Sequence, residues 1–130
     1  MTWNIWAAVA AMNGLLSVAA GAFGSHALRE KLSERHLEVF ETAARYHMYH
    51  ALALLAAAWL MSRTPSATAS AAAWCFLMGM ILFSGSLYAL ALTGVGKLGA
   101  VIPIGGLSLM IGWLLLAWSA MQAHPGIVND

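Results

Sequence analysis

The stretch ASAAAWCFLMGMILFSGSLYALAL at residues 69–92 carries no charged side chain, and it decides the class of the protein. An α-helix needs about 20 apolar residues to cross the roughly 30 Å hydrocarbon core of a bilayer. Further apolar stretches at 3–24, 46–61 and 98–121 follow the same pattern. A membrane barrel would instead need at least about eight short strands of alternating polarity. We therefore predict an all-α integral membrane protein, a four-helix bundle that forms a single transmembrane domain over residues 1–130.

The composition supports lipid as the main partner of this chain. Hydrophobic residues make up 62% of the sequence and charged residues only 8%, whereas a soluble domain carries roughly 25% charged residues. The net charge of +1 gives no electrostatic reason to expect nucleic acid as a partner. Cys75 is the one cysteine, so an intramolecular disulfide is excluded.

Most of the charged residues lie between the first and second apolar stretches. Over residues 28–44, apolar side chains recur at helical spacing with charged residues between them. Ser33 is a candidate N-cap for the helical residues that follow it. We predict a short amphipathic helix over 28–44 that lies in the membrane interface and leads into the second span. A docking face for a soluble partner is the alternative interpretation of the same segment.

The orientation follows from the lysine and arginine residues near the ends of the spans. Five of them fall after the first and third spans, and Arg63 falls on the opposite side with the amino terminus: Arg29, Lys31, Arg35, Arg45 and Lys97 form the larger group. The count predicts a cytoplasmic amphipathic segment, with the N- and C-termini outside.

Small residues predict where the helices pack closely. Ser17 and Gly21 are four positions apart in the first span, and Gly85 and Gly105 offer the same close approach in the third and fourth. Pro103 predicts a kink near residues 99–103, because proline frees a helix carbonyl and clashes with the preceding turn.

Polar side chains within or beside the spans are the candidates for a binding site, because burying them in lipid is costly. Asn13 lies midway along the first span, and its simplest role is an interhelical hydrogen bond. The candidate polar cluster, expected near the cytoplasmic face, consists of His26, Glu41, Arg45, Tyr46, His50, Ser84, Ser86 and Tyr88. Arg45 could also recognise an anionic lipid head group.

Histidines raise the question of a metal or haem iron. His47 and His50 are three residues apart and share a helix face, and His26 could approach from the first span. No Cys-X-X-Cys or His-Glu-X-X-His motif strengthens this possibility. We predict no metal, no cofactor and no catalytic residue, and therefore no enzyme, since the sequence also contains no nucleophile elbow and no phosphate-binding glycine loop.

Several blocks together resemble a known family. These are GAFGSHAL at 21–28, FETAARYHMYHALAL at 40–54, LFSGSLY at 82–88, LGAVIPIGG at 98–106, and Gly112-Trp113. They resemble domain-of-unknown-function family 423, small four-span proteins of the bacterial inner membrane with an animal relative called transmembrane protein 256. The resemblance implies this fold and location but no ligand. At position 47 this chain has histidine where the family looks more often to have glutamine.

Three classes of function follow from these observations. The first is a non-catalytic accessory or oligomerising membrane component, either a homo-oligomer or a part of a larger membrane complex. The second is binding or transport of a small molecule, lipid or ion at the polar cluster. The third is a haem, metal or quinone site with a redox role.

Overall fold

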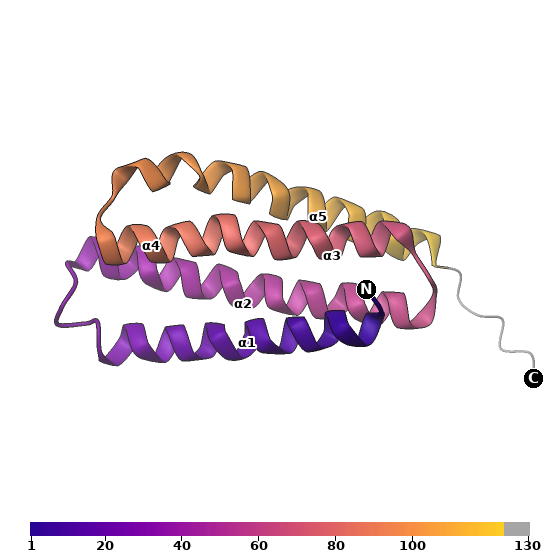
Figure 1. Ribbon diagram of the computed structural model, residues 1–130, viewed down its shortest axis with the longest axis horizontal. Coiled ribbons are helices and arrows are strands. Elements are labelled where there is room, and N and C mark those ends of the chain that lie inside the picture. Colours follow the sequence, from indigo (N-terminus) through magenta and orange to yellow (C-terminus); the bar gives the residue numbers. More distant parts are fainter. Residues whose placement is uncertain (124–130) are drawn as a thin grey trace, which may run out of the picture.

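The computed structural model describes residues 1–123, and this part of the chain contains helices and turns but no strand. Four helical rods lie side by side, and each runs antiparallel to the rod before it in the sequence (Figure 1). They are α1 (Trp3–His26), α2 (Glu34–Arg63), a rod made of α3 (Ala67–Gly79), a π-helical turn (Met80–Ser84) and α4 (Gly85–Thr93), and a rod made of a 3₁₀ turn (Gly96–Ala100) and α5 (Ile102–Gln122).

Local sequence signals set the ends of these helices. Ser33 is the N-cap of α2, as predicted, because its side-chain oxygen accepts a hydrogen bond from the His36 N–H at 3.2 Å. Ser66 caps α3 in the same way through the Ala69 N–H. α4 ends at Gly94, whose φ of 70° is the left-handed conformation that glycine adopts without strain.

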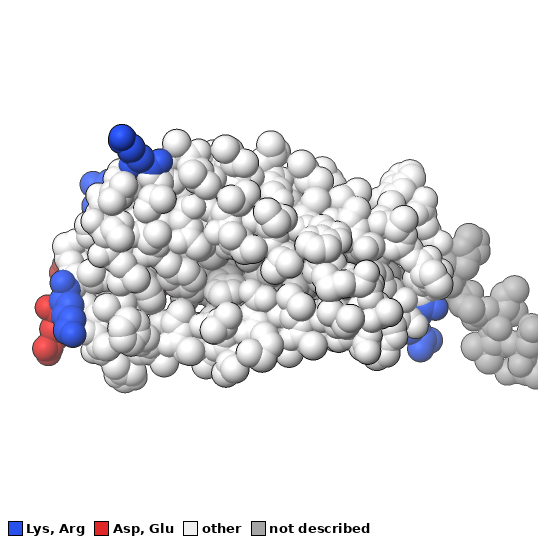
Figure 2. All heavy atoms as spheres, in the orientation of Figure 1, with Lys and Arg blue, Asp and Glu red and all other residues white. Residues whose placement is uncertain are grey.

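Three of the rods are long and apolar enough to cross a membrane: Trp3–His26, Ala67–Thr93 and Gly96–Gln122. Their outward faces carry large apolar side chains, such as Leu114 with 72% of its surface exposed. On the face seen in Figure 2 the charged side chains gather at the two ends of the bundle, and the middle of this face has none. This distribution is that of a protein with lipid around its middle. α2 is not among the three rods, because its first turns are polar.

The predicted boundaries of the amphipathic helix are wrong. Residues 27–33 form turns, and residues 34–44 are the beginning of α2, which continues without interruption to Arg63. The apolar side chains of this segment are covered by the bundle itself: Leu28 and Phe40 are buried with Ala91 of α4. The amphipathic pattern therefore reflects a helix that packs on its neighbours through one face.

The core is built mainly from alanines, which let the middle of α2 approach α3. Ala57 and Ala58 of α2 and Ala72 and Ala73 of α3 are fully buried around Phe76. Two serines add hydrogen bonds between helices. Ser17 donates to the Ala44 carbonyl at 2.7 Å, and Ser108 donates to the Cys75 carbonyl at 2.8 Å.

Glycines carry the contact between α5 and the third rod. A Cβ on Gly105 would collide with the backbone of Phe83, and one on Gly112 would lie 2.7 Å from the Phe76 ring. The other two predicted packing glycines have different surroundings. A Cβ on Gly21 would meet nothing within 4 Å, and one on Gly85 would meet only its own rod, at 4.0 Å. Gly24 takes the role expected of Gly21, because it faces the ring of Phe40.

Pro103 does not kink a helix, in contrast to the prediction. It occupies the first turn of α5, where the missing N–H has no partner to lose. The preceding residues 96–100 form a 3₁₀ turn instead of the start of a longer α-helix. The chain therefore passes from a 3₁₀ turn into α5 at this point and does not form one long helix with a kink.

α1 packs along α2 and has no extended contact with α4 or α5. At one end of the bundle, Trp6 of α1 meets Trp74 of α3 edge to face, with ring centroids 4.9 Å apart. Between Trp6 and the charged end, α1 and the third rod stand apart over α2. This arrangement creates the groove in which the polar side chains described next are found.

Candidate functional site

A chain of hydrogen bonds links three helices halfway along the bundle. His47 of α2 lies between Asn13 of α1 and Tyr88 of α4. Its Nε2 is 3.0 Å from Asn13 Oδ1, and its Nδ1 is 3.2 Å from Tyr88 Oη. Asn13 in turn donates from Nδ2 to the Val9 carbonyl at 2.8 Å. His47 thus connects the floor of the groove to both of its walls.

The partners fix the direction of this chain. The Val9 carbonyl can only accept, so Asn13 turns its amino group toward Val9 and its oxygen toward His47. His47 must then carry a proton on Nε2, which it donates to Asn13. In the neutral imidazole Nδ1 accepts from the Tyr88 hydroxyl, and the oxygen of Tyr88 keeps the capacity to accept one more hydrogen bond.

The π-helical turn at Met80–Ser84 lies against this chain. In this turn the Gly85 N–H bonds to the Met80 carbonyl, five residues back. A serine within a regular helix commonly donates to the carbonyl four residues earlier. Ser84 makes no such bond, and its hydroxyl is buried, 1% exposed as a residue, without a partner in the described part of the chain. π-turns of this kind occur often at functional sites.

A pocket of about 240 Å³ brings these groups together. Its polar lining consists of Asn13, His47, Ser84 and Tyr88, and Met80, Ile81 and Gly85 complete it. We refer to it as the polar pocket. No charged residue lines it. It can therefore offer a ligand a free hydroxyl from Ser84 and an acceptor from Tyr88, in surroundings that are otherwise apolar.

A second hollow, which we call the apolar groove, continues from the polar pocket toward the charged end. It has a volume of about 490 Å³ and opens to the side of the bundle. His47 and Tyr88 line both spaces. The rest of the groove is lined by apolar side chains from α1, α2 and α4: Leu16, Ala19, Ala20, Phe23, Phe40 and Leu92.

His50, a predicted site residue, has a structural position. Its Nδ1 donates to the Tyr46 carbonyl at 2.7 Å, and its Nε2 accepts from the indole N–H of Trp113 at 3.1 Å. Since a carbonyl only accepts and an indole only donates, His50 is a neutral imidazole with both nitrogens used. The Tyr46 ring packs against Phe83, with centroids 5.1 Å apart.

The other predicted cluster members are dispersed. His26 ends α1 and is exposed, and Glu41 and Arg45 are exposed on α2. Because α2 is continuous, Glu41 and His50 point away from each other. Ser86 is nearly buried on α4 and is not among the side chains that line the polar pocket. Of the eight predicted cluster residues, the structure brings only Ser84 and Tyr88 into the polar pocket.

His47 and His50 do not form a metal-binding group with other residues in the described part of the chain. His47 and His50 lie on one side of α2 as predicted, but each uses both ring nitrogens in bonds to other residues. Within residues 1–123, no three His, Cys, Asp or Glu side chains are placed to hold a metal ion. The described residues therefore offer a hydrogen-bonding site and no metal-ligand set.

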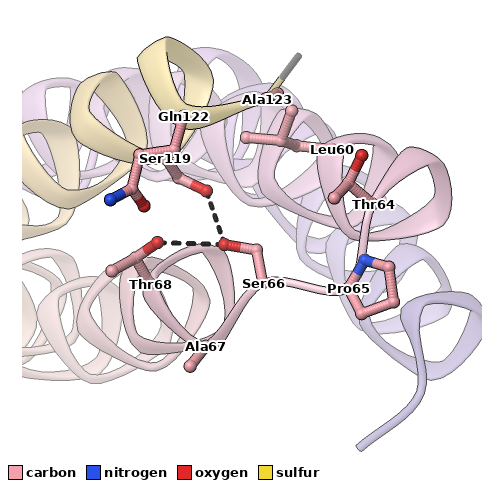
Figure 3. A pocket seen from close by; sticks show the side chains of 9 residues that line it. All are labelled: Leu60, Thr64, Pro65, Ser66, Ala67, Thr68, Ser119, Gln122 and Ala123. Carbon is pink, nitrogen blue, oxygen red and sulfur yellow. Dashed lines mark hydrogen bonds between the residues drawn. The ribbon is translucent and has the colours of Figure 1, made fainter. Parts of the chain in front are cut away.

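A second polar cluster lies at the end of the bundle opposite to the charged first turns of α2 (Figure 3). The Ser66 hydroxyl lies 2.7 Å from Ser119 Oγ and 2.9 Å from Thr68 Oγ1, and it also accepts from the Ala69 N–H. These three bonds use the capacity of the Ser66 hydroxyl. The cluster joins the loop between α2 and α3 to the end of α5, so we interpret it as a structural connection.

Two polar residues that line the polar pocket, Asn13 and His47, do not belong to the predicted cluster because their sequence signals are weaker. Asn13 was expected to form an interhelical hydrogen bond, and it does so, but nothing in its neighbourhood predicted His47 as the partner. The sequence offers His47 as a possible metal or haem ligand or as an interfacial histidine, and neither interpretation names Asn13 or Tyr88 as its partner. Trp113, the partner of His50, lies 63 positions away in the sequence and had no distinguishing pattern.

Comparison with known proteins gives a consistent assignment. The family model described as "Protein of unknown function (DUF423)" matches residues 20–106. A UPF0382 membrane protein of Staphylococcus epidermidis is 43% identical over 119 residues, which cover 92% of this chain and 97% of that protein. The UPF0382 membrane protein YwdK of Bacillus subtilis is 39% identical over 120 residues, covering 92% and 98%. No solved structure matches this chain significantly.

Proposed function

Because the chain belongs to the DUF423 family of bacterial membrane proteins, whose function is unknown, we propose a function from its geometry alone. The protein is a non-enzymatic component of the inner membrane that binds a small molecule in the polar pocket between α1, α2 and α4. One observation carries this proposal: the buried Ser84 hydroxyl has no hydrogen-bond partner within residues 1–123, and Ser84 lines the same pocket as the Asn13–His47–Tyr88 chain.

The energetics favour a ligand over a purely structural role. A buried hydroxyl without a partner costs about 1–3 kcal/mol, and apolar surroundings increase this cost. If Ser84 served packing alone, alanine at this position would cost the protein no stability. The π-turn that exposes Ser84 to the pocket also interrupts the regular hydrogen bonding of a membrane-spanning rod. A ligand oxygen that accepts from Ser84 offsets the cost of the unpaired hydroxyl.

The proposal includes four membrane crossings in a four-helix bundle. α2 has 30 residues, about 45 Å of helix, so it can cross the core and still extend its charged first turns into the interface. Most lysine and arginine residues lie at the end of the bundle that holds the first turns of α2. We therefore place these turns on the cytoplasmic side and the N- and C-termini outside.

Cysteine labelling tests the orientation. In a Cys75→Ser background, a membrane-impermeant maleimide added to intact cells should label Ser62→Cys, near the outer end of α2, and spare Lys97→Cys. Both variants should react once the membrane is permeabilised. Labelling of Lys97→Cys alone in intact cells would reverse the orientation.

Native mass spectrometry of protein extracted in mild detergent tests ligand binding. Wild type should retain a small-molecule adduct, and so should Leu114→Ala, which changes an outward-facing side chain. Ser84→Leu, which fills the polar pocket, should lose the adduct. Equal adducts in all three proteins would contradict the proposal.

We further propose that any second copy or larger membrane complex contacts α1. Gly14 and Gly21 lie on this helix with nothing from the rest of the chain within 4 Å of a Cβ placed on them. Both glycines are half-buried, and small residues on a helix surface let another helix approach closely. Gly21→Leu should therefore abolish any oligomer or co-purifying protein seen for the wild type.

A further inference from the structure

The polar pocket and the apolar groove share the lining residues His47 and Tyr88, so the two hollows lie side by side. We propose that their ligand is an uncharged amphiphile: a molecule with a carbonyl or hydroxyl oxygen at Ser84 and a hydrocarbon chain in the apolar groove. This inference rests on the proposed function, because it names the class of molecule that the same site accepts.

The head group must be uncharged because the site provides no counter-charge. No lysine, arginine, aspartate or glutamate lines the polar pocket or the apolar groove. Asn13 lies near the middle of α1, and Ser84 lies within the apolar rod Ala67–Thr93, nine residues before its end. In a crossing bundle this depth is far from water, where an unpaired charge is most costly. Phosphate, carboxylate and ammonium head groups are thereby excluded.

The head group must accept a hydrogen bond, because the site offers a ligand one free donor, the Ser84 hydroxyl. The Ser84 hydroxyl has a proton with no acceptor among the residues that the structure describes. The Tyr88 oxygen has acceptor capacity left after it donates to His47. A carbonyl oxygen can use the Ser84 proton, and a hydroxyl can use both groups. A pure hydrocarbon would leave Ser84 unpaired.

The remainder of the ligand must be apolar, because of the walls of the groove. Ser84 and Leu92 are eight residues apart on one rod, which corresponds to about 12 Å along the helix axis. Over this distance the lining side chains are aliphatic or aromatic, apart from His47 and Tyr88. Phe40 closes the floor beside Tyr88, with ring centroids 4.9 Å apart. The groove opens sideways, so a molecule dissolved in the bilayer can enter without passing through water.

Defined compounds added to the protein in lipid nanodiscs test this inference by native mass spectrometry. The neutral probes are dodecanol and a quinone with a decyl chain, which separate hydroxyl from carbonyl recognition. The charged probes of similar chain length are dodecanoate and dodecyl phosphate. We expect the neutral probes to bind on the order of 100-fold more tightly than the charged probes. Ser84→Ala should weaken neutral binding about five-fold, the effect of one hydrogen bond.

The outcomes separate the inference from the proposed function. If the charged probes bind as tightly as the neutral ones and Ser84→Leu removes both, the pocket binds a ligand but the inferred class is wrong. If no probe binding responds to Ser84→Leu while Leu114→Ala and wild type behave alike, the site itself is wrong. Neutral binding that Ser84→Leu removes, while Leu114→Ala leaves it intact, supports both.

Discussion

The indole N–H of Trp113 donates to His50 Nε2 at 3.1 Å, and this bond joins α5 to α2 across the bundle. The His50 ring is nearly buried, and its other nitrogen is engaged with the Tyr46 carbonyl. Trp113 also packs edge to face on Phe76, with ring centroids 5.4 Å apart. His50 therefore links α2 to α5 by a hydrogen bond, and neither of its ring nitrogens is available to a ligand.

Trp113→Phe should lower the stability of the bundle by about 1–3 kcal/mol, because it leaves the buried His50 Nε2 without a partner. Thermal loss of helical circular dichroism in detergent measures this change. Trp118→Phe is the matched control, since Trp118 lies on the same helix with 54% of its surface exposed. Equal melting of the two variants would show that the bond to His50 contributes nothing.

Gly105→Ala should destabilise the protein by about 3 kcal/mol or more. A Cβ at this position would lie 2.7 Å from the Leu82 carbonyl carbon, and backbone atoms of the π-turn cannot move aside as a side chain can. Gly106→Ala provides the control on the neighbouring residue, because its nearest contact would be an ordinary 3.7 Å to the Phe83 ring. Gly106→Ala should be neutral or stabilising by up to about 1 kcal/mol. Similar loss for both variants would contradict close packing of α5 on the π-turn.

The all-helical class and three of the apolar spans could be predicted because apolar length is a local property of the sequence. The boundaries of the charged segment could not, because an amphipathic pattern looks the same whether its apolar face meets lipid or a neighbouring helix. Phe40 illustrates this: its spacing fitted an interfacial helix, but it packs against Gly24 and Tyr88.

The candidate site was harder to predict than the fold. Tyr88 and Ser84 stood out because polar groups within a span are costly. His47 and Asn13 belong to different helices, and only the packing of α1 on α2 brings them within 3.0 Å. The π-turn at Met80–Ser84 left no signal in the sequence, since its residues are ordinary for a membrane helix.

His47→Gln should preserve the hydrogen-bonded chain, whereas His47→Leu should break it. An amide side chain has both a donor for Asn13 Oδ1 and an acceptor for the Tyr88 hydroxyl, as the neutral imidazole does. The leucine variant leaves two half-buried polar groups unpaired, at a cost of about 1–3 kcal/mol. Thermal unfolding of both variants in detergent compares them. A glutamine variant as unstable as the leucine variant would contradict this account of the chain.

Ser84→Ala should increase the stability of the ligand-free protein by about 1 kcal/mol, because it removes a buried hydroxyl that has no partner in the described part of the chain. The same substitution should reduce the stabilisation that added dodecanol provides. Ser17→Ala is the contrasting variant, since Ser17 is equally buried but donates to the Ala44 carbonyl. It should be destabilised in both conditions. Loss of stability in ligand-free Ser84→Ala would show that Ser84 has a structural partner after all.

Photolabelling with a long-chain alcohol that carries a diazirine next to its hydroxyl tests the central claim most directly. After irradiation in lipid nanodiscs and digestion, mass spectrometry should place the label on residues that line the polar pocket, chiefly Ile81, Ser84 and Tyr88, and Ser84→Leu should remove it. Label spread evenly over outward-facing residues such as Met110 and Leu114, and unchanged in Ser84→Leu, would contradict a ligand site between α1, α2 and α4.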